Sequence, residues 1–535
     1  MQIVAYAPYG ADGIIIRVEA DIRRGIPGVD ITGLAEGAVR EARERVRAAF
    51  RNSGFPFPQD RILINLAPAG LRKDGASLDL PIALSVMTAA ALIPGMDSGP
   101  APGEPESLLV MGELELSGRL RPVRGVLAAT ATALRAGIRD CIVPAENARE
   151  AAVLTGGRYA AVHSLGDAVR ALVIRRETGS FPALNPVPAA LPERQGEAGD
   201  FADVKGQRRY KRALEIAAAG GHNLLVFGPP GAGKTMLARR LPSILPPLEA
   251  WESVEVTRLH SLAGQFLAEN PPVPAHITRP PFRSPHHSAS AEGILGGGKT
   301  IRPGEISLAN FGILFLDEAP EFRSNVLQAL REPLEDRVIT ISRADGPVRL
   351  PADFQILLAA NTCPCGRLGI RPAAGAGDLY GGAGCLCSPE EIRRYWRKFG
   401  AALLDRVELR APVLPPGAGE MAGEDEEPSR QVALRVLRAV ETQRARFKGS
   451  AIRRNARIPA GLIGRYCSLS GDAEKAFRAA VEKLGFSGRA FHGVLRTART
   501  IADLEGRQEI GALHILEAVQ HRRLGDDPYD ILQAE

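Results

Sequence analysis

Long hydrophobic runs are absent from this 535-residue chain, and cysteine is scarce, with six residues. The most apolar stretch, residues 80–93, is too short to span a membrane and contains Pro81 and Thr88, so it predicts a buried core helix and no membrane partner. The first ten residues, MQIVAYAPYG, lack the basic and apolar segments of a signal peptide. Six cysteines do not make a disulfide framework. We expect a cytoplasmic protein of three or four domains.

A strong charge of either sign is also missing. Lys and Arg number 67 and Asp and Glu number 61, which gives a formal net charge of +6. This moderate basic excess permits a polyanionic partner without requiring one. Hydrophobic residues make up 45% of the chain, a share that excludes disorder throughout.

The pattern along the chain predicts α/β domains followed by a helical one. Short apolar strands alternate with helical stretches over residues 1–175, which indicates a first α/β domain. Residues 176–200 are rich in Pro, Gly and charge and predict a linker, and residues 201–412 form a second α/β domain. Residues 413–428 predict a mobile acidic loop. Residues 429–535 are predicted to be helical, with a 3.6-residue apolar period that extends to residue 522.

The most specific motif is GPPGAGKT at residues 228–235, which fits G-x-x-x-x-G-K-[ST]. An apolar strand, NLLVFG, precedes it, and a helix is predicted for MLARRLPSIL after it. Glycines let backbone N–H groups surround a phosphate, Lys234 reaches the β- and γ-phosphates, and Thr235 offers its hydroxyl to Mg²⁺. The motif therefore predicts ATP and Mg²⁺ as cofactors. Its residues are Gly228, Pro229, Pro230, Gly231, Ala232, Gly233, Lys234 and Thr235.

Two further buried strands end in polar residues. The run of apolar residues 313–316 is followed by Asp317, which can hold Mg²⁺, and by Glu318, which can polarise the attacking water. The strand in DFQILLAANT ends at Asn361, which can contact the γ-phosphate or position water. An Asn that only ends a strand and starts a turn is the alternative for this position.

These motifs, together with the helical tail, resemble those of the AAA+ ring ATPases. The stretches DFADVKGQRRYKRALEIAAAGGHNLLVFGPPGAGKT, RPPFRSPHHSAS, GGGKTIRPGEISLANFGILFLDEAPEF and NTCPCG are more closely similar to the ComM/YifB group of magnesium-chelatase-like AAA+ proteins. The resemblance covers essentially the whole chain except the linker and the acidic loop. It implies an AAA+ P-loop domain with a parallel sheet, a C-terminal helical lid and assembly into a homohexameric ring.

The resemblance also assigns roles to arginines. It places Arg406, in LLDRVEL, at the position of an arginine finger that enters the neighbouring subunit's site; by itself the motif would suggest a surface Asp–Arg pair. Arg489 is the better candidate for a second sensor arginine, with Arg496 as the alternative, and spacing does not decide between them because both recur on one helical face.

Two segments of the second α/β domain suggest contacts beyond ATP. VITISR and GPVRLP predict a hairpin around Ala344 and Asp345, and the resemblance suggests that it points into a ring pore. Arg343 and Arg349 are then candidate DNA phosphate contacts, whereas ordinary solvent-facing arginines are the alternative. The glycine-rich stretch 282–299 is expected to be an insertion that lines the pore or a subunit interface.

Four cysteines form two C-x-C pairs separated by 19 residues: Cys363, Cys365, Cys385 and Cys387. Two such knuckles can close a tetrahedral structural Zn²⁺ site, although C-x-C is tighter than the usual C-x₂-C. Four unligated thiols are the alternative.

The first domain resembles the Lon protease catalytic domain in LAPAGLRKDGASLDLPIALSV and in the segment 111–144. The family's Ser–Lys dyad would place Ser at Ser77 and Lys at Leu127. Because leucine cannot take a proton, and because Lys73 lies outside the expected position, we predict no peptidase activity. An arginine series at positions 40, 43, 45, 47 and 51 predicts either a DNA-binding face or a solvated helix face.

The sequence therefore predicts an ATP-hydrolysing ring motor. The resemblance suggests DNA as its load, with branch migration of strand-invaded intermediates in recombination or natural transformation. A magnesium-chelatase motor subunit and a protein-remodelling or regulatory ATPase are the alternatives.

Overall fold

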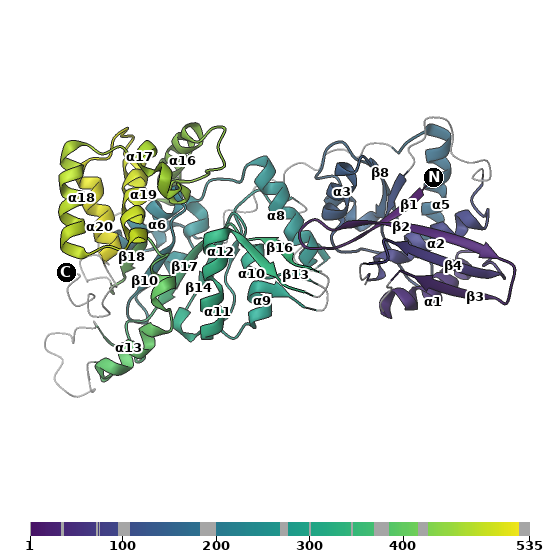
Figure 1. Ribbon diagram of the computed structural model, residues 1–535, viewed down its shortest axis with the longest axis horizontal. Helices are drawn as coiled ribbons and strands as arrows, with labels where there is room; N and C mark the ends of the chain where they lie inside the picture. Colours follow the sequence, from purple (N-terminus) through teal and green to yellow (C-terminus); the bar gives the residue numbers. More distant parts are fainter. Residues whose placement is uncertain are drawn as a thin grey trace.

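The computed structural model describes residues 2–33, 37–70, 73, 75–94, 107–181, 199–267, 276–298, 301–343, 346–368, 385–415 and 426–523, with the backbone only for 38–40. Figure 1 shows an elongated molecule with the N-terminal domain at one end, the helical C-terminal part at the other and an α/β domain between them. No helix among the described residues is long and apolar enough to cross a membrane.

The N-terminal domain is built on a seven-stranded mixed sheet in the order β3-β4-β2-β1-β5-β8-β9. Residues of β1 alternate between its faces, so that Ile3 and Ala5 pack with one core and Val4 and Tyr6 with another. Helices α1, α2 and α5 cover the first face, and α3 and α4 cover the second. The strands are β1 (Gln2–Ala7), β2 (Ile14–Arg23), β3 (Gly28–Thr32), β4 (Arg61–Ala67), β5 (Ser107–Val110), β8 (Asp140–Pro144) and β9 (Arg158–Val162), with a short hairpin of β6 (Glu113–Leu114) and β7 (Leu120–Arg121). The helices are α1 (Gly37–Asn52), α2 (Asp79–Ala89), α3 (Val126–Arg135), α4 (Ala148–Ala151) and α5 (Leu165–Thr178).

The central domain contains a five-stranded parallel sheet in the order β11-β14-β17-β10-β18. Its inner strands are apolar on both faces, because helices cover both. In β14, Ile313 and Phe315 face one core and Leu314 and Leu316 the other. The strands are β10 (Leu224–Phe227), β11 (Phe282–Arg283), β14 (Ile313–Leu316), β17 (Gln355–Ala360) and β18 (Leu409–Pro412).

Two antiparallel hairpins stand outside this sheet: β12 (Gly296–Gly297) with β13 (Arg302–Pro303), and β15 (Val338–Ile341) with β16 (Val348–Pro351). The second is the hairpin predicted from the sequence. The helices of the domain are α6 (Arg208–Gly220), α7 (Lys234–Ala238), α8 (Ala250–Ala263), α9 (Ala291–Leu295), α10 (Glu305–Leu308), α11 (Ser324–Ala329), α12 (Arg331–Asp336), α13 (Pro389–Arg397) and α14 (Ala401–Leu404).

The C-terminal part is helical, as its apolar period predicts. It shares one hydrophobic core with α6 and one face of the parallel sheet, so the lid and the central domain are packed together. Its helices are α16 (Ser429–Arg446), α17 (Ile463–Tyr466), α18 (Gly471–Leu484), α19 (Gly488–Leu504) and α20 (Ala512–Arg523).

Two sequence expectations are corrected by the structure, and a third, the mobility of the acidic loop, stays a prediction because its residues 416–425 lie outside the described part of the chain. The helix expected for MLARRLPSIL ends at Ala238 and resumes as a 3₁₀ turn over Leu241–Ile244, where Pro242 lacks an N–H for a continuous helix. Part of the expected glycine-rich insertion, β11, is instead the edge strand of the parallel sheet. The acidic loop is anchored at both described ends, because Val413 N–H donates to Phe227 O (2.8 Å) and the Glu426 carboxylate accepts from Lys211 Nζ (2.7 Å).

The N-terminal domain contacts the central domain along α8. Leu262 of α8 packs into the core formed by α3 and its sheet face. Ser261 of α8 donates to the buried carboxylate of Glu150, and Arg258 forms an ion pair with Asp12 (2.6 Å). Burial raises the pKa of Glu150 despite these hydrogen bonds.

Candidate nucleotide site

The phosphate-binding loop joins β10 to α7. Gly231 and Gly233 have φ values of +77° and +89°, which place both in the left-handed region that glycine adopts without strain. A Cβ at either position would meet no atom within 4 Å, so backbone conformation, not crowding, requires glycine there. The loop leaves its backbone facing open space, as binding of a phosphate group requires.

Lys234 begins α7 and turns back into the loop. Its Nζ donates to Gly228 O (2.7 Å), Pro229 O (2.9 Å) and Asn361 Oδ1 (3.0 Å). Burial lowers the pKa of Lys234 to about 8, and the charges of Asp317 and Glu318 partly oppose this shift. An ammonium held by carbonyl oxygens in this way can transfer to phosphate oxygens when a nucleotide enters.

The predicted magnesium ligands lie together at the ends of β10 and β14. Thr235 Oγ1 donates to Asp317 Oδ2 (2.7 Å), so the two side chains that would share Mg²⁺ are already in contact. Glu318 has a φ of +48° and a side chain that is 59% exposed. Its Oε2 lies 3.8 Å from Nδ1 of His287, which stacks on His286 with 4.1 Å between ring centroids.

Asn361 follows β17, the strand between β10 and β14. Besides accepting from Lys234, it donates its backbone N–H to Tyr395 Oη (3.3 Å). Lys234, Asp317 and Asn361 thus meet at the carboxyl edge of the parallel sheet, where ligands bind in open α/β folds.

The two predicted arginines lie at the opposite edge of the sheet. Asn223, just before β10, donates from Nδ2 to Arg406 O (2.8 Å). The Arg406 guanidinium pairs with Glu335 of α12 and donates to Ala402 O (2.7 Å). Arg489 also pairs with Glu335, through Nη2 contacts of 2.9 and 3.0 Å to its two oxygens. The alternative, Arg496, is largely buried and donates from Nε to Ile458 O (2.8 Å).

The hairpin β15–β16 lies next to the N-terminal domain. Arg343 and Arg349 are both exposed, and residues 344 and 345 at the tip lie outside the described part of the chain. A Cβ on Gly10 would stand 3.0 Å from the Arg349 carbonyl oxygen, so the β1–β2 turn packs closely on β16. Ala11, Asp12, Arg258 and Arg349 line a cavity there of about 390 Å³.

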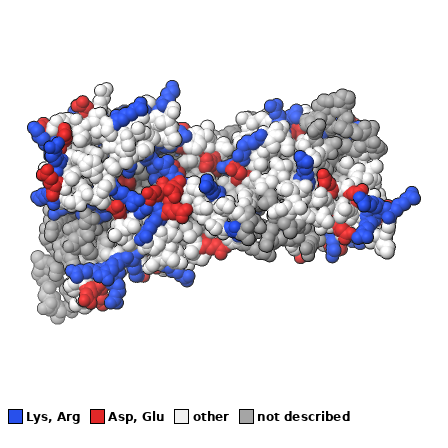
Figure 2. All heavy atoms as spheres, in the orientation of Figure 1, with Lys and Arg blue, Asp and Glu red and all other residues white. Residues whose placement is uncertain are grey.

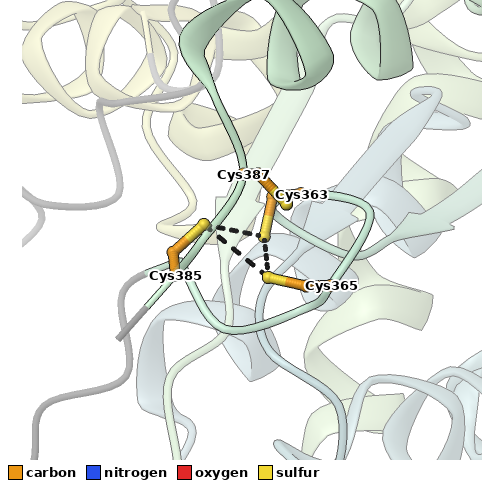
Figure 3. A group of neighbouring side chains, drawn as sticks. All are labelled: Cys363, Cys365, Cys385 and Cys387. Carbon is orange, nitrogen blue, oxygen red and sulfur yellow. Dashed lines mark hydrogen bonds between the residues drawn. The ribbon is translucent and has the colours of Figure 1, made fainter. Parts of the chain in front are cut away.

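The four clustered cysteines come together although their two pairs are separated in sequence. Cys363 and Cys365 follow β17 and Asn361, and Cys385 and Cys387 precede α13 (Figure 3). Their sulfur atoms all lie within 4.8 Å of one another, with separations of 3.3, 3.5 and 3.7 Å among the first three. The group has the donor atoms and the spacing to hold a metal ion.

In the N-terminal domain, backbone carbonyl oxygens hold the ammonium group of Lys73. Lys73 Nζ is buried and donates to the backbone oxygens of Gly33 (2.7 Å) and Pro68, and burial lowers its pKa. Leu127 is buried at the start of α3 and donates its N–H to Glu150 Oε1 (2.9 Å). Ser77 lies in a 3₁₀ turn before α2.

Some arginines of the series on α1 make contacts with other residues of the N-terminal domain. Arg45 forms an ion pair with Asp79 (2.7 Å), whose side chain is completely buried. Arg47 lies over the Phe57 ring at 5.6 Å. At least these two arginines stabilise the packing of α1, so the series is not a uniform solvent-facing charge stripe.

Sequence reasoning did not identify His287, Glu335 or Tyr395. The proximity of His287 to Glu318 depends on β11 lying beside β14, which no motif in the sequence indicates. Glu335 and Tyr395 carry no motif, and only the tertiary fold brings them to Arg406 and Asn361.

The sheet order and the site at its carboxyl edge define a P-loop nucleotide-binding protein. The model of the family described as magnesium chelatase, subunit ChlI, matches residues 200–420, and models for its C-terminal part and for subunit ChlI of Mg-chelatase match residues 426–522 and 18–147.

Relatives match along almost the entire chain. An uncharacterized protein of Mycobacterium tuberculosis is 41% identical over 96% of this chain and 97% of its own length. YifB of Salmonella typhimurium is 40% identical (97% and 96%), and competence protein ComM of Haemophilus influenzae is 37% identical (98% and 97%). The chain therefore belongs to the ComM/YifB family of magnesium-chelatase-like AAA+ ATPases. A Lon protease of Salinispora arenicola is 28% identical over 35% of this chain and 23% of its own length, and its similarity supports the Lon-like domain.

Proposed function

We propose that this protein is an ATP-driven motor that acts on DNA as a homohexameric ring. The observation that carries the proposal is the division of the nucleotide site between opposite edges of one sheet. Lys234, Asp317 and Asn361 lie at the carboxyl edge, whereas Arg406 lies at the other. An arginine that completes the site would therefore come from a neighbouring chain.

In this proposal each residue has a separate task in hydrolysis. Thr235 and Asp317 would hold Mg²⁺, and Lys234 would bind the β- and γ-phosphates. Glu318 would polarise the attacking water, which its exposed side chain can reach from solvent. Arg406 of the adjacent chain would stabilise the transition state, a contribution of about 10³–10⁵ in rate in phosphoryl-transfer enzymes.

DNA is the load that the hairpin arginines and the relatives favour. Arg343 and Arg349 on β15–β16 would contact DNA phosphates. Figure 2 shows basic side chains interleaved with acidic ones over the visible face, and a denser group of basic side chains over α13. A DNA contact on this face would therefore involve individual basic elements. The name of the relative ComM, a competence protein, supports a role in natural transformation, and we propose branch migration of recombination intermediates as the activity.

The cysteine cluster would hold one structural Zn²⁺. A tetrahedral Zn²⁺ with Zn–S bonds of about 2.3 Å places sulfur atoms about 3.8 Å apart. The three separations among Cys363, Cys365 and Cys385, 3.3 to 3.7 Å, are close to that geometry. The N–H of Leu368 points at Cys363 Sγ (3.4 Å), as expected for a thiolate ligand. Four protein ligands would leave no open position for chemistry.

ATP hydrolysis measured with single-stranded, duplex and four-way-junction DNA, and without DNA, tests the load. Stimulation of severalfold that disappears in Glu318→Gln and declines with added salt is the expected result. Vigorous hydrolysis that no DNA changes would overturn the DNA motor and favour a protein-remodelling or chelatase-type load.

Mixing two inactive variants tests the shared site. Lys234→Ala lacks the phosphate contact, and Arg406→Ala lacks the finger. If the finger acts between chains, a mixed ring contains some sites in which both residues are intact, and hydrolysis returns. Continued inactivity, with mixed rings verified by size-exclusion chromatography and mass spectrometry, would contradict a finger supplied by the neighbour.

A further inference from the structure

The cysteine cluster adjoins the catalytic edge of the sheet. Asn361, the first residue after β17, contacts Lys234 through its side chain, and Cys363 follows two residues later. Cys363 is completely buried. Any movement of the first cysteine pair is therefore transmitted to Asn361 over a single intervening residue.

Hydrogen bonds make that intervening segment stiff. The carbonyl of Thr362 accepts from Trp396 Nε1 (3.0 Å), and its hydroxyl donates to Leu368 O (2.7 Å). Tyr395, beside Trp396 on α13, accepts from the Asn361 N–H (3.3 Å). Helix α13 begins directly after the second cysteine pair, so the sulfur cluster ties α13 to the end of β17.

A second contact joins the cluster to the phosphate-binding loop. Gly366, one residue after Cys365, has a φ of +74°, and a Cβ there would stand 2.7 Å from Pro230 Cδ. The segment that contains Cys365 and Gly366 therefore packs against the phosphate-binding loop and leaves no room for a methyl group at Gly366. Movement of the first cysteine pair would displace Pro230 as well as Asn361.

We propose that the tetrathiolate metal site positions the nucleotide site, so that occupancy of the metal site sets the rate of ATP hydrolysis. With the metal bound, the two cysteine pairs are held together, and Asn361 and Pro230 are held where a nucleotide needs them. Without it, only thiol contacts and the hydrogen bonds to Tyr395 and Trp396 hold the two pairs, and the catalytic edge loosens. This inference rests on the proposed ATPase function and gives the zinc site a positioning role in it.

The first experiment uses the full-length chain and its own metal. Zinc is counted by inductively coupled plasma mass spectrometry, removed by a strong chelator that is then dialysed away, and restored at one equivalent, with Mg²⁺ constant in every assay. We expect one zinc per chain, a loss of kcat of at least tenfold after removal, and recovery on restoration. A metal-free chain that hydrolyses ATP at the original rate would overturn the inference.

Variants distinguish loss of the zinc site or of the Gly366–Pro230 contact from a general loss of folding. Cys365→Ser should lose zinc and kcat, whereas Cys467→Ser, a buried cysteine of the lid, should change neither. Gly366→Ala should keep zinc but weaken nucleotide binding at least fivefold. Gly506→Ala is its matched control, because its φ is +67° and no atom lies within 4 Å of its Cβ. Equal nucleotide affinity in Gly366→Ala and Gly506→Ala would refute the contact with Pro230.

The outcomes also separate this inference from the proposed function. DNA-stimulated hydrolysis that is independent of zinc would leave the motor intact and overturn the positioning role. A chain that neither contains nor binds zinc, with hydrolysis intact, would overturn both the metal site and its positioning role and would leave the motor intact. Unfolding temperatures measured for each sample distinguish a displaced catalytic edge from an unfolded domain.

Discussion

The affinity for ATP should fall as the pH rises above about 8. Lys234 is buried without a phosphate partner, and its pKa is lowered to about 8 in the nucleotide-free chain. The negative charges of a bound nucleotide would favour the ammonium and raise that pKa. A group whose pKa is higher in the complex stabilises the complex fully below the pKa of the free form. That stabilisation is lost as the pH climbs toward the pKa of the bound form.

The size of the effect follows from the fraction of Lys234 that carries a proton. With a pKa of about 8, that fraction is about 90% at pH 7 and about 10% at pH 9, so the dissociation constant should rise about tenfold across this range. In excess Mg²⁺, which lowers the pKa of the terminal phosphate, the Mg–ATP complex carries the same charge at both pH values, so its own titration does not mask the change.

Fluorescence titration with a labelled, slowly hydrolysed ATP analogue at pH 7, 8 and 9 measures this rise. Calorimetry in buffers of different ionisation enthalpy should show proton uptake on binding at pH 8 to 9. Lys234→Arg is the control, since its guanidinium stays charged and should make affinity independent of pH. The same pH dependence in Lys234→Arg, or none in the natural chain, would refute the assignment to Lys234.

Three further variants probe contacts that only the structure reveals. His287→Ala should lower kcat about two- to fivefold with nucleotide affinity unchanged, the expected size for a partly exposed polar contact, whereas His286→Ala should not; equal losses in a steady-state hydrolysis assay would contradict this. Glu335→Gln should raise kcat by up to about fivefold, because the exposed pair that retains Arg406 is weak; a large loss would show that Glu335 supports the finger. Arg45→Ala should lower the free energy of unfolding by about 3–5 kcal/mol in denaturant titration, because its aspartate partner stays buried without a counter-ion; a change under 1 kcal/mol would contradict it.

Local sequence patterns predict the elements of this fold well where a strand is buried on both faces or where a helix has a periodic apolar face. The apolar run before Asp317 could only be an inner parallel strand, and the 3.6-residue period of the lid could only be helical. Short strands were harder to predict. The two residues of β11 carry no strand pattern of their own, and pairing with β14 alone makes them part of the sheet.

The candidate site likewise contains residues whose positions the sequence predicts and residues whose surroundings it does not predict. Lys234, Thr235 and Asp317 belong to contiguous sequence motifs from which phosphate and magnesium binding can be predicted. Their proximity follows because parallel strands end at one edge of the sheet. The environment of Arg406 depends on α12, α14 and α19, which are far apart in sequence. No spacing rule predicts that one carboxylate, Glu335, binds both Arg406 and Arg489.

That shared carboxylate bears on how a ring would use its arginines. The Arg406 side chain is only 15% exposed, and it is held by Glu335 and by Ala402 O. To reach a neighbour's phosphate it must leave both partners, and Arg489 would then keep Glu335 paired. The pairing of Arg489 thus lowers the electrostatic cost of releasing Arg406. Since both arginines lie at the edge opposite Lys234, their contribution to hydrolysis in the proposed ring would act on the adjacent chain's nucleotide.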